Sequence, residues 1–121
     1  MKSNELRLGN LFIDEKTKTI INVIGLTEQY ITFSGHFKNH WQAKPIEITE
    51  EWLLKFGFIS YGKLNPTYRL NPFIVELSIL GKHYNFRKIM NKEESVLLKE
   101  IKYVHQLQNI YFSLTEKELT V

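Results

Sequence analysis

The chain has 121 residues, of which 43% are hydrophobic, and its formal net charge is +3. This length and composition are typical of one folded domain and not of a disordered protein. The chain contains no cysteine, which excludes disulfides, thiolate metal sites and cysteine nucleophiles.

The first third of the chain predicts a meander of short strands. The segment LFID precedes the polar turn EKTK, the segment TIINVIGL is apolar and β-branched, and QYITFS alternates apolar and polar side chains. Short strands in this order are typical of a small barrel, so we expect an SH3-like set of strands within residues 1–45. The end of this region, SGHFKNHWQAKP, predicts a loop.

A short helix and an antiparallel sheet are predicted next. In ITEEWLLKFGF, Thr49 suits the N-cap of a helix and Gly57 suits the position just after its end. Residues 65–89 predict two or three strands, with a hairpin turn at Gly81-Lys82. The segment SVLLKEI fits either a strand or a helix, and we favour a strand because its surroundings have β patterns.

Residues 103–121 predict an amphipathic helix. At about 100° per residue, one arc forms the core face, and it consists of Val104, Leu107, Ile110, Tyr111 and Leu114. A second stripe, with spacings of three and four residues, consists of His105, Gln108, Asn109 and Phe112. The stripe either packs under the N-terminal strands or binds a partner.

Together these elements predict a single α+β domain. Residues 1–45 form the SH3-like strands and the loop. Residues 46–121 form a short helix, an antiparallel sheet and a C-terminal amphipathic helix packed on that sheet.

Catalytic motifs are absent from the sequence, which lacks GxGxxG, a Walker loop, GxSxG and HExxH. His36 and His40 are four residues apart, but no cysteine or carboxylate lies near them in the sequence. We therefore expect a non-enzymatic protein with no metal site and no cofactor.

Aromatic and basic residues interleave in two segments that are candidates for binding. Residues 29–45 contain four aromatic residues, several basic ones and no acidic residue, whereas residues 81–92 are rich in cations. Such segments can stack bases and neutralise phosphates, anchor a protein partner, or simply pack and solubilise the fold. With the helical stripe, the candidate binding residues are Phe37, Lys38, His40, Trp41, Lys44, Lys82, Arg87, Lys88, His105, Gln108, Asn109 and Phe112.

Charge is distributed unevenly along the chain. Residues 52–92 carry seven basic side chains against one acidic side chain, Glu76. If folding gathered these cations on one face, the face would attract polyanions.

Three segments in order, NELRLGN, IEITEEWLLKFGF and YVHQLQNIYFSLTEKEL, resemble a group of small proteins of Bacteroidetes chromosomes and their prophages. The resemblance implies a phage or mobile-element origin, and it implies no reaction, cofactor or catalytic residue. That group often has LTGEEL where this chain has Glu116 in place of the glycine. Because glycine suits the left-handed end of a helix, we expect either a different helix end here or strain at Glu116.

These observations favour a binding protein that acts on a host partner, a protein or a ribonucleoprotein. The specific hypothesis is an anti-CRISPR-like inhibitor, which binds a host defence nuclease or its guide-RNA complex through Trp41, Phe37 and the basic middle of the chain. The alternatives are a nucleic-acid-binding accessory protein and a structural or assembly protein of a mobile element. No apolar run approaches the roughly 20 residues that span a bilayer, and the N-terminus lacks the apolar core of a signal peptide. We therefore expect a cytoplasmic protein with no membrane partner.

Overall fold

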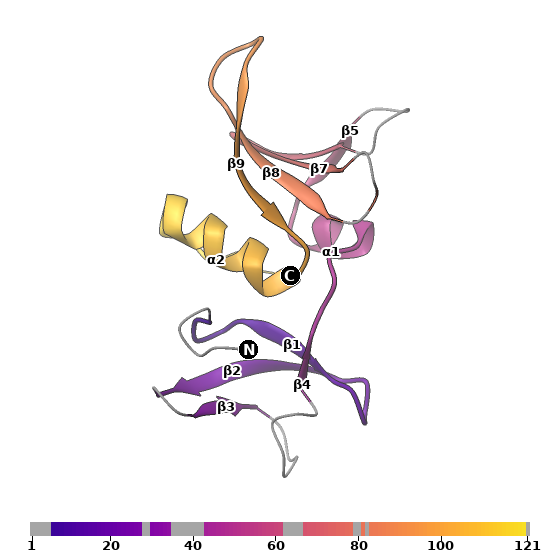
Figure 1. The fold of residues 1–121 in the computed structure, drawn as a ribbon, viewed down its shortest axis with the longest axis vertical. Helices are drawn as coiled ribbons and strands as arrows, with labels where there is room; N and C mark the ends of the chain where they lie inside the picture. Colours follow the sequence, from indigo (N-terminus) through magenta and orange to yellow (C-terminus); the bar gives the residue numbers. More distant parts are fainter. Residues whose placement is uncertain are drawn as a thin grey trace. The chain divides into compact units, whose positions relative to one another are not determined.

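The computed structural model describes residues 6–27, 30–34, 43–61, 67–78, 81 and 83–120. These residues form nine strands and two helices (Figure 1). The predicted α+β class is therefore confirmed, with most of the regular structure in strands. The chain divides into two compact units, the first made of Met1–Glu47 with Tyr103–Glu118 and the second of Ile48–Lys102 with Leu119–Val121.

The first unit contains a four-stranded antiparallel sheet with the order β3-β2-β1-β4. Its strands are β1 (Leu11–Asp14), β2 (Ile20–Leu26), β3 (Ile31–Phe33) and β4 (Ala43–Pro45). The predicted meander of the first three strands is confirmed, and β4 is an addition that the sequence did not reveal. The SH3-like arrangement stays a prediction.

One face of this sheet carries a small apolar core. Phe12 lies opposite Ile21 on β2 and opposite Pro45 on β4, so these three side chains share a face. Phe12, Ile21 and Val23 cluster there with Leu6, and each is 7% exposed or less. Burial of such side chains stabilises the unit, at roughly 1.5–3 kcal/mol for each large one.

The C-terminal helix α2 (Val104–Thr115) belongs to the first unit and contacts β1. At its start, the side-chain oxygen of Gln106 accepts a hydrogen bond from the N–H of Tyr103 at 3.0 Å. At its end, Glu116 has φ 60° and ψ 18°, the left-handed conformation. The strain expected at this position is thus present in the backbone. We predicted that this helix packs on the second sheet, whereas the contacts described here are with the first.

The second unit contains the short helix α1 (Glu50–Lys55) and a five-stranded antiparallel sheet. The predicted cap is confirmed, because the hydroxyl of Thr49 accepts a hydrogen bond from the N–H of Trp52 at 3.4 Å. Gly57 follows the helix with φ +96°, a conformation that favours glycine. The strands, in the order β5-β6-β7-β8-β9, are β5 (Ile59–Tyr61), β6 (Thr67–Leu70), β7 (Phe73–Leu77), β8 (Tyr84–Ile89) and β9 (Ser95–Ile101).

The two faces of the five-stranded sheet differ in burial. Tyr68, Val75 and Phe86 lie opposite one another on β6, β7 and β8, and each is 4% exposed or less. The side chains between them point the other way, because neighbouring residues on a strand alternate between faces. We call this other side of the sheet the open face, and across the three central strands it carries Arg69, Ile74 and Arg87.

Candidate binding surface

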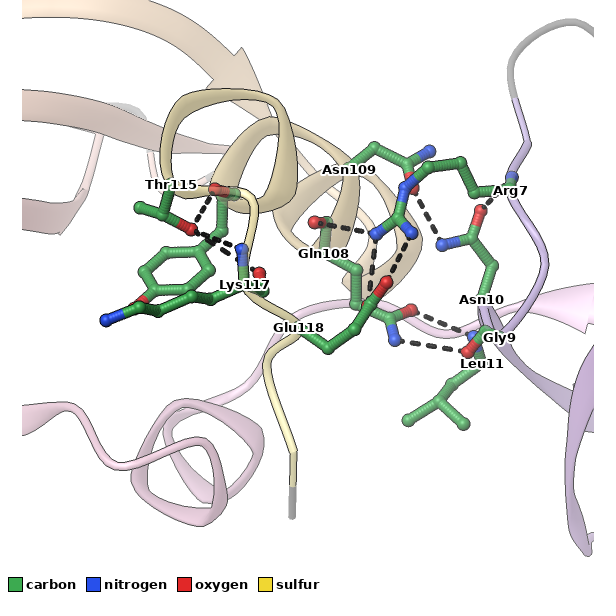
Figure 2. A network of polar contacts seen from close by, with 10 residues as sticks. Arg7, Gly9, Asn10, Leu11, Gln108, Asn109, Thr115, Lys117 and Glu118 are labelled. Atoms are coloured by element: carbon green, nitrogen blue, oxygen red, sulfur yellow. Dashed lines mark hydrogen bonds and ion pairs between the residues drawn. The ribbon is translucent and has the colours of Figure 1, made fainter.

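The helical stripe predicted as a binding surface holds the first unit together. The ring of His105 stacks on Phe12 with 5.1 Å between the ring centres. The side chain of Gln108 accepts a hydrogen bond from the N–H of Leu11 at 2.9 Å and donates one to the carbonyl of Gly9 at 3.3 Å (Figure 2). His105 and Gln108 are 4% and 3% exposed. The contacts of the stripe therefore fit the interpretation that it packs under the N-terminal strands.

The other two residues of the stripe meet the segment just before β1. The amide of Asn10 donates a hydrogen bond to the side-chain oxygen of Asn109 at 2.7 Å. The guanidinium of Arg7 lies 4.1 Å from the ring centre of Phe112, at a distance typical of a cation–π contact. Both contacts keep these side chains within the first unit.

Arg7 joins this network from the N-terminal segment, and no pattern in the sequence singles it out as a site residue. Its guanidinium donates to both carboxylate oxygens of Glu118, at 2.6 and 3.2 Å, and to the backbone carbonyl of Gln108 at 3.3 Å (Figure 2). A bidentate arginine–carboxylate pair is among the strongest polar contacts in proteins. It ties the segment after α2 to the segment before β1.

Of the candidates in the aromatic and basic loop, the structure describes one, Lys44. Phe37, Lys38, His40 and Trp41 lie outside the described residues, as does Lys82. Lys44 is described on β4, where its ammonium lies 3.8 Å from the carboxylate of Glu15 and half of its side chain is exposed. An exposed pair at this distance contributes little to stability, so Lys44 can still contact a partner.

Arg87 and Lys88 do not act on the same side of the sheet. They are neighbours on β8, so Arg87 is on the open face and Lys88 on the opposite one. Arg87 is also engaged: it donates hydrogen bonds to the hydroxyl and carbonyl of Ser95 at 2.9 and 3.0 Å, and it lies 3.7 Å from a carboxylate oxygen of Glu76. Lys88 is therefore separated from Arg69 and Arg87, which share the open face.

The open face also presents apolar and aromatic side chains that no sequence pattern indicated. Ile59 and Tyr61 on the edge strand β5 are 64% and 52% exposed. Both lie on the open face, because Ile59 is opposite Arg69 and Tyr61 is two residues further on. The guanidinium of Arg69 lies 6.0 Å from the ring centre of Tyr61. Nothing in the sequence marks β5, since three residues carry too little periodicity to predict a strand.

A pocket of about 370 Å³ opens at the end of this face, beside the turn between β8 and β9. Arg69, Ile74 and Ile89 line it from the sheet, and Ser95 and residues 91–94 line it from the turn. The turn is held by the side chain of Asn91, whose oxygen accepts hydrogen bonds from two backbone N–H groups at 2.9 Å. The open face thus combines exposed apolar groups with a hollow of mixed polarity.

Two tyrosines report on the buried face of the same sheet. Burial raises the pKa of Tyr68 above its ordinary value, with smaller contributions from Glu50 and Tyr84. Burial likewise raises the pKa of Tyr84, again with a contribution from Glu50. The acidic start of α1 thus adds a negative charge that disfavours ionisation of both tyrosines.

Among the residues that the structure describes, no cluster of three or more histidine or acidic side chains is arranged to hold a metal ion. No helix in that part of the chain is both long enough and apolar enough to cross a bilayer. Comparisons of the chain with protein-family models, with curated proteins and with solved structures find no match.

Proposed function

We propose that the protein is a non-enzymatic binding protein that docks on another protein through the open face of its second unit. The observation that carries this proposal is the pair of exposed side chains Ile59 and Tyr61 next to Arg69 and the pocket. Tyrosine and arginine are enriched among the residues that dominate protein interfaces. A large apolar side chain such as Ile59, exposed beside them, gains free energy when a partner removes it from water.

The charge balance of the open face favours a protein partner over a nucleic acid. Three positive charges come from Arg69, Arg87 and, at the pocket, Lys92, and four negative ones come from Glu76, Glu100 and, at the pocket, Glu93 and Glu94. Binding of a polyanion depends on cations that neutralise phosphates, and these groups together carry no excess of positive charge. A polar, electrically balanced rim around apolar groups is instead typical of protein–protein interfaces.

As the target we propose a host defence nuclease, so that the protein acts as an anti-CRISPR-like inhibitor. The support for this step is the phage or mobile-element origin implied by the resemblance, together with the absence of catalytic motifs. A small phage protein without catalytic residues can act by occupying a host machine.

The test is an affinity pull-down of the tagged full chain from host lysate, with and without nuclease treatment, followed by mass spectrometry. The site variants are Ile59→Lys and Tyr61→Ala, whose side chains are too exposed for a large effect on folding. The matched control is Leu54→Lys, which changes an exposed apolar residue of helix α1 in the same unit.

We expect one protein partner that survives nuclease treatment, is retained by the control variant and is lost with both site variants. Capture of nucleic acid alone, lost on nuclease treatment or at moderate salt, would move the protein to the accessory class. A partner that both site variants still capture would exclude the open face as the binding surface.

A further inference from the structure

The pocket beside the turn between β8 and β9 has the size of a small-molecule site. Its volume is about 370 Å³, and pockets for small ligands have volumes of about 300–1,000 Å³. The turn that forms one wall is held in place by hydrogen bonds. The side-chain oxygen of Asn91 accepts from the N–H groups of Glu93 and Glu94, and the carbonyl of Glu94 accepts from the N–H of Met90, each at 2.9 Å.

The polar side chains of the pocket have hydrogen-bond donors left for a ligand. Among the described residues, the guanidinium of Arg69 donates one hydrogen bond, to the side-chain oxygen of Asn71 at 3.1 Å, and its other N–H groups remain. The oxygen of Asn91 is occupied by the turn, so its NH₂ group remains. The hydroxyl of Ser95 accepts from Arg87 at 2.9 Å, so its own O–H remains. A ligand that satisfies these groups must carry acceptors.

The apolar side chains of the pocket define the rest of the ligand. Ile74 and Ile89 line it from the sheet, and both are half-buried. An aliphatic group of the ligand gains free energy when it leaves water for these two side chains.

The charges of the pocket limit the ligand to one negative charge. Arg69 and Lys92 line it together with Glu93 and Glu94, so its formal charges balance. A phosphate or another multiply charged anion would need an excess of cations. A single carboxylate needs only one guanidinium, whose planar fork matches its two oxygens.

We propose that this pocket binds the carboxylate of a small aliphatic acid, with Arg69 on the carboxylate and Ile74 and Ile89 on the aliphatic stem. This goes beyond the proposed function, because binding needs no host protein. The residues that line the pocket do not include Ile59 or Tyr61, so the two proposals can fail separately.

The test is an NMR titration of the ¹⁵N-labelled full chain with isovalerate at neutral pH. The amide signals of the residues that line the pocket should shift and saturate, with a dissociation constant of about 1–10 mM for a ligand of this size. Three further probes each change one feature. Isovaleramide lacks the charge, acetate lacks the stem and isobutylamine reverses the charge, and all three should bind more weakly.

Variants then test the role of Arg69. Arg69→Gln should weaken isovalerate binding at least about tenfold, because hydrogen bonds to charged groups are the strong ones. The matched control is Lys88→Gln, which removes a cation from the opposite face of the sheet and should bind as the wild type does. Ile59→Lys should also bind normally. If Arg69→Gln does not fold, Arg69→Lys replaces it, since it keeps the charge and loses the fork.

Four results would overturn the proposal. They are the absence of saturable shifts with isovalerate, shifts that arise away from the pocket, isobutylamine or isovaleramide binding as tightly as isovalerate, and equal affinities of the Arg69 variant and Lys88→Gln. Loss of the host partner in the pull-down would leave these outcomes unchanged, because no host protein is present in the titration.

Discussion

Gln108 joins the C-terminal helix to the first strand, and its removal should cost the protein much of its stability. Its buried amide group accepts a hydrogen bond from the N–H of Leu11 and donates one to the carbonyl of Gly9. Gln108→Leu keeps a side chain of similar size but removes both bonds. The N–H and the carbonyl then lose their partner in a part of the protein where Gln108 is only 3% exposed.

The magnitude follows from these two bonds. Each intramolecular hydrogen bond contributes about 1 kcal/mol net, and a buried donor or acceptor left without a partner costs about 1–3 kcal/mol. Leucine recovers part of this loss through its greater hydrophobicity. We expect the free energy of unfolding to fall by about 2–3 kcal/mol, a large share of the roughly 5–15 kcal/mol of a small protein.

Urea unfolding followed by circular dichroism measures this change, and hydrogen exchange locates it. The amide of Leu11 should exchange faster in Gln108→Leu, because its acceptor is gone. Ser113→Ala, at an exposed position of the same helix, should change the free energy of unfolding by less than about 0.5 kcal/mol. If Gln108→Leu is as stable as this control, the account of the stripe as the link between helix and strand is wrong.

Two further predictions concern the helix end and the buried tyrosines. Glu116→Gly should raise the free energy of unfolding by about 0.5–1 kcal/mol. The left-handed conformation costs a non-glycine residue about 1–2 kcal/mol, whereas glycine loses about 0.5–1 kcal/mol of chain entropy on folding. A lower melting temperature of the variant would contradict this prediction. The raised pKa of Tyr68 predicts stability that is fully present below pH 10.0 and lost as the pH rises through the pKa of the folded state. Between a pH below 10.0 and a pH above it, the melting temperature should therefore fall less for Tyr68→Phe than for the wild type. Equal falls would exclude Tyr68 as a source of the loss of stability at alkaline pH.

Local features of this fold could be predicted from the sequence. The cap at Thr49, the turn at Gly57 and the amphipathic helix that begins at Val104 all depend on residues within one or two turns of each other. The strand at residues 95–101 was also predicted correctly, although its pattern alone left a helix open. These patterns depend on residues close together in the sequence, so they can be recognised without knowledge of the tertiary contacts.

Which surface is available for binding was decided only by the tertiary structure. The stripe of α2 has the residues of an interface, yet it lies against Arg7, Asn10 and Phe12. These contacts join residues about a hundred positions apart, and no spacing along the chain encodes them. The three-residue strand β5 is the opposite case. Its side chains Ile59 and Tyr61 are exposed in the structure, but no pattern in the sequence distinguishes them as surface residues.

The basic middle of the chain illustrates the same limit for charge. A count along residues 52–92 gives a strong positive excess, but the pairing of β8 sends Arg87 and Lys88 to opposite faces and sets Arg87 beside Glu76. Strand alternation and cross-strand register fix where each charge lies. The sequence by itself therefore determined several local elements, such as the capped helix α1 and the strand β9. The tertiary structure decided which side chains are exposed, because burial depends on contacts between segments far apart in the chain.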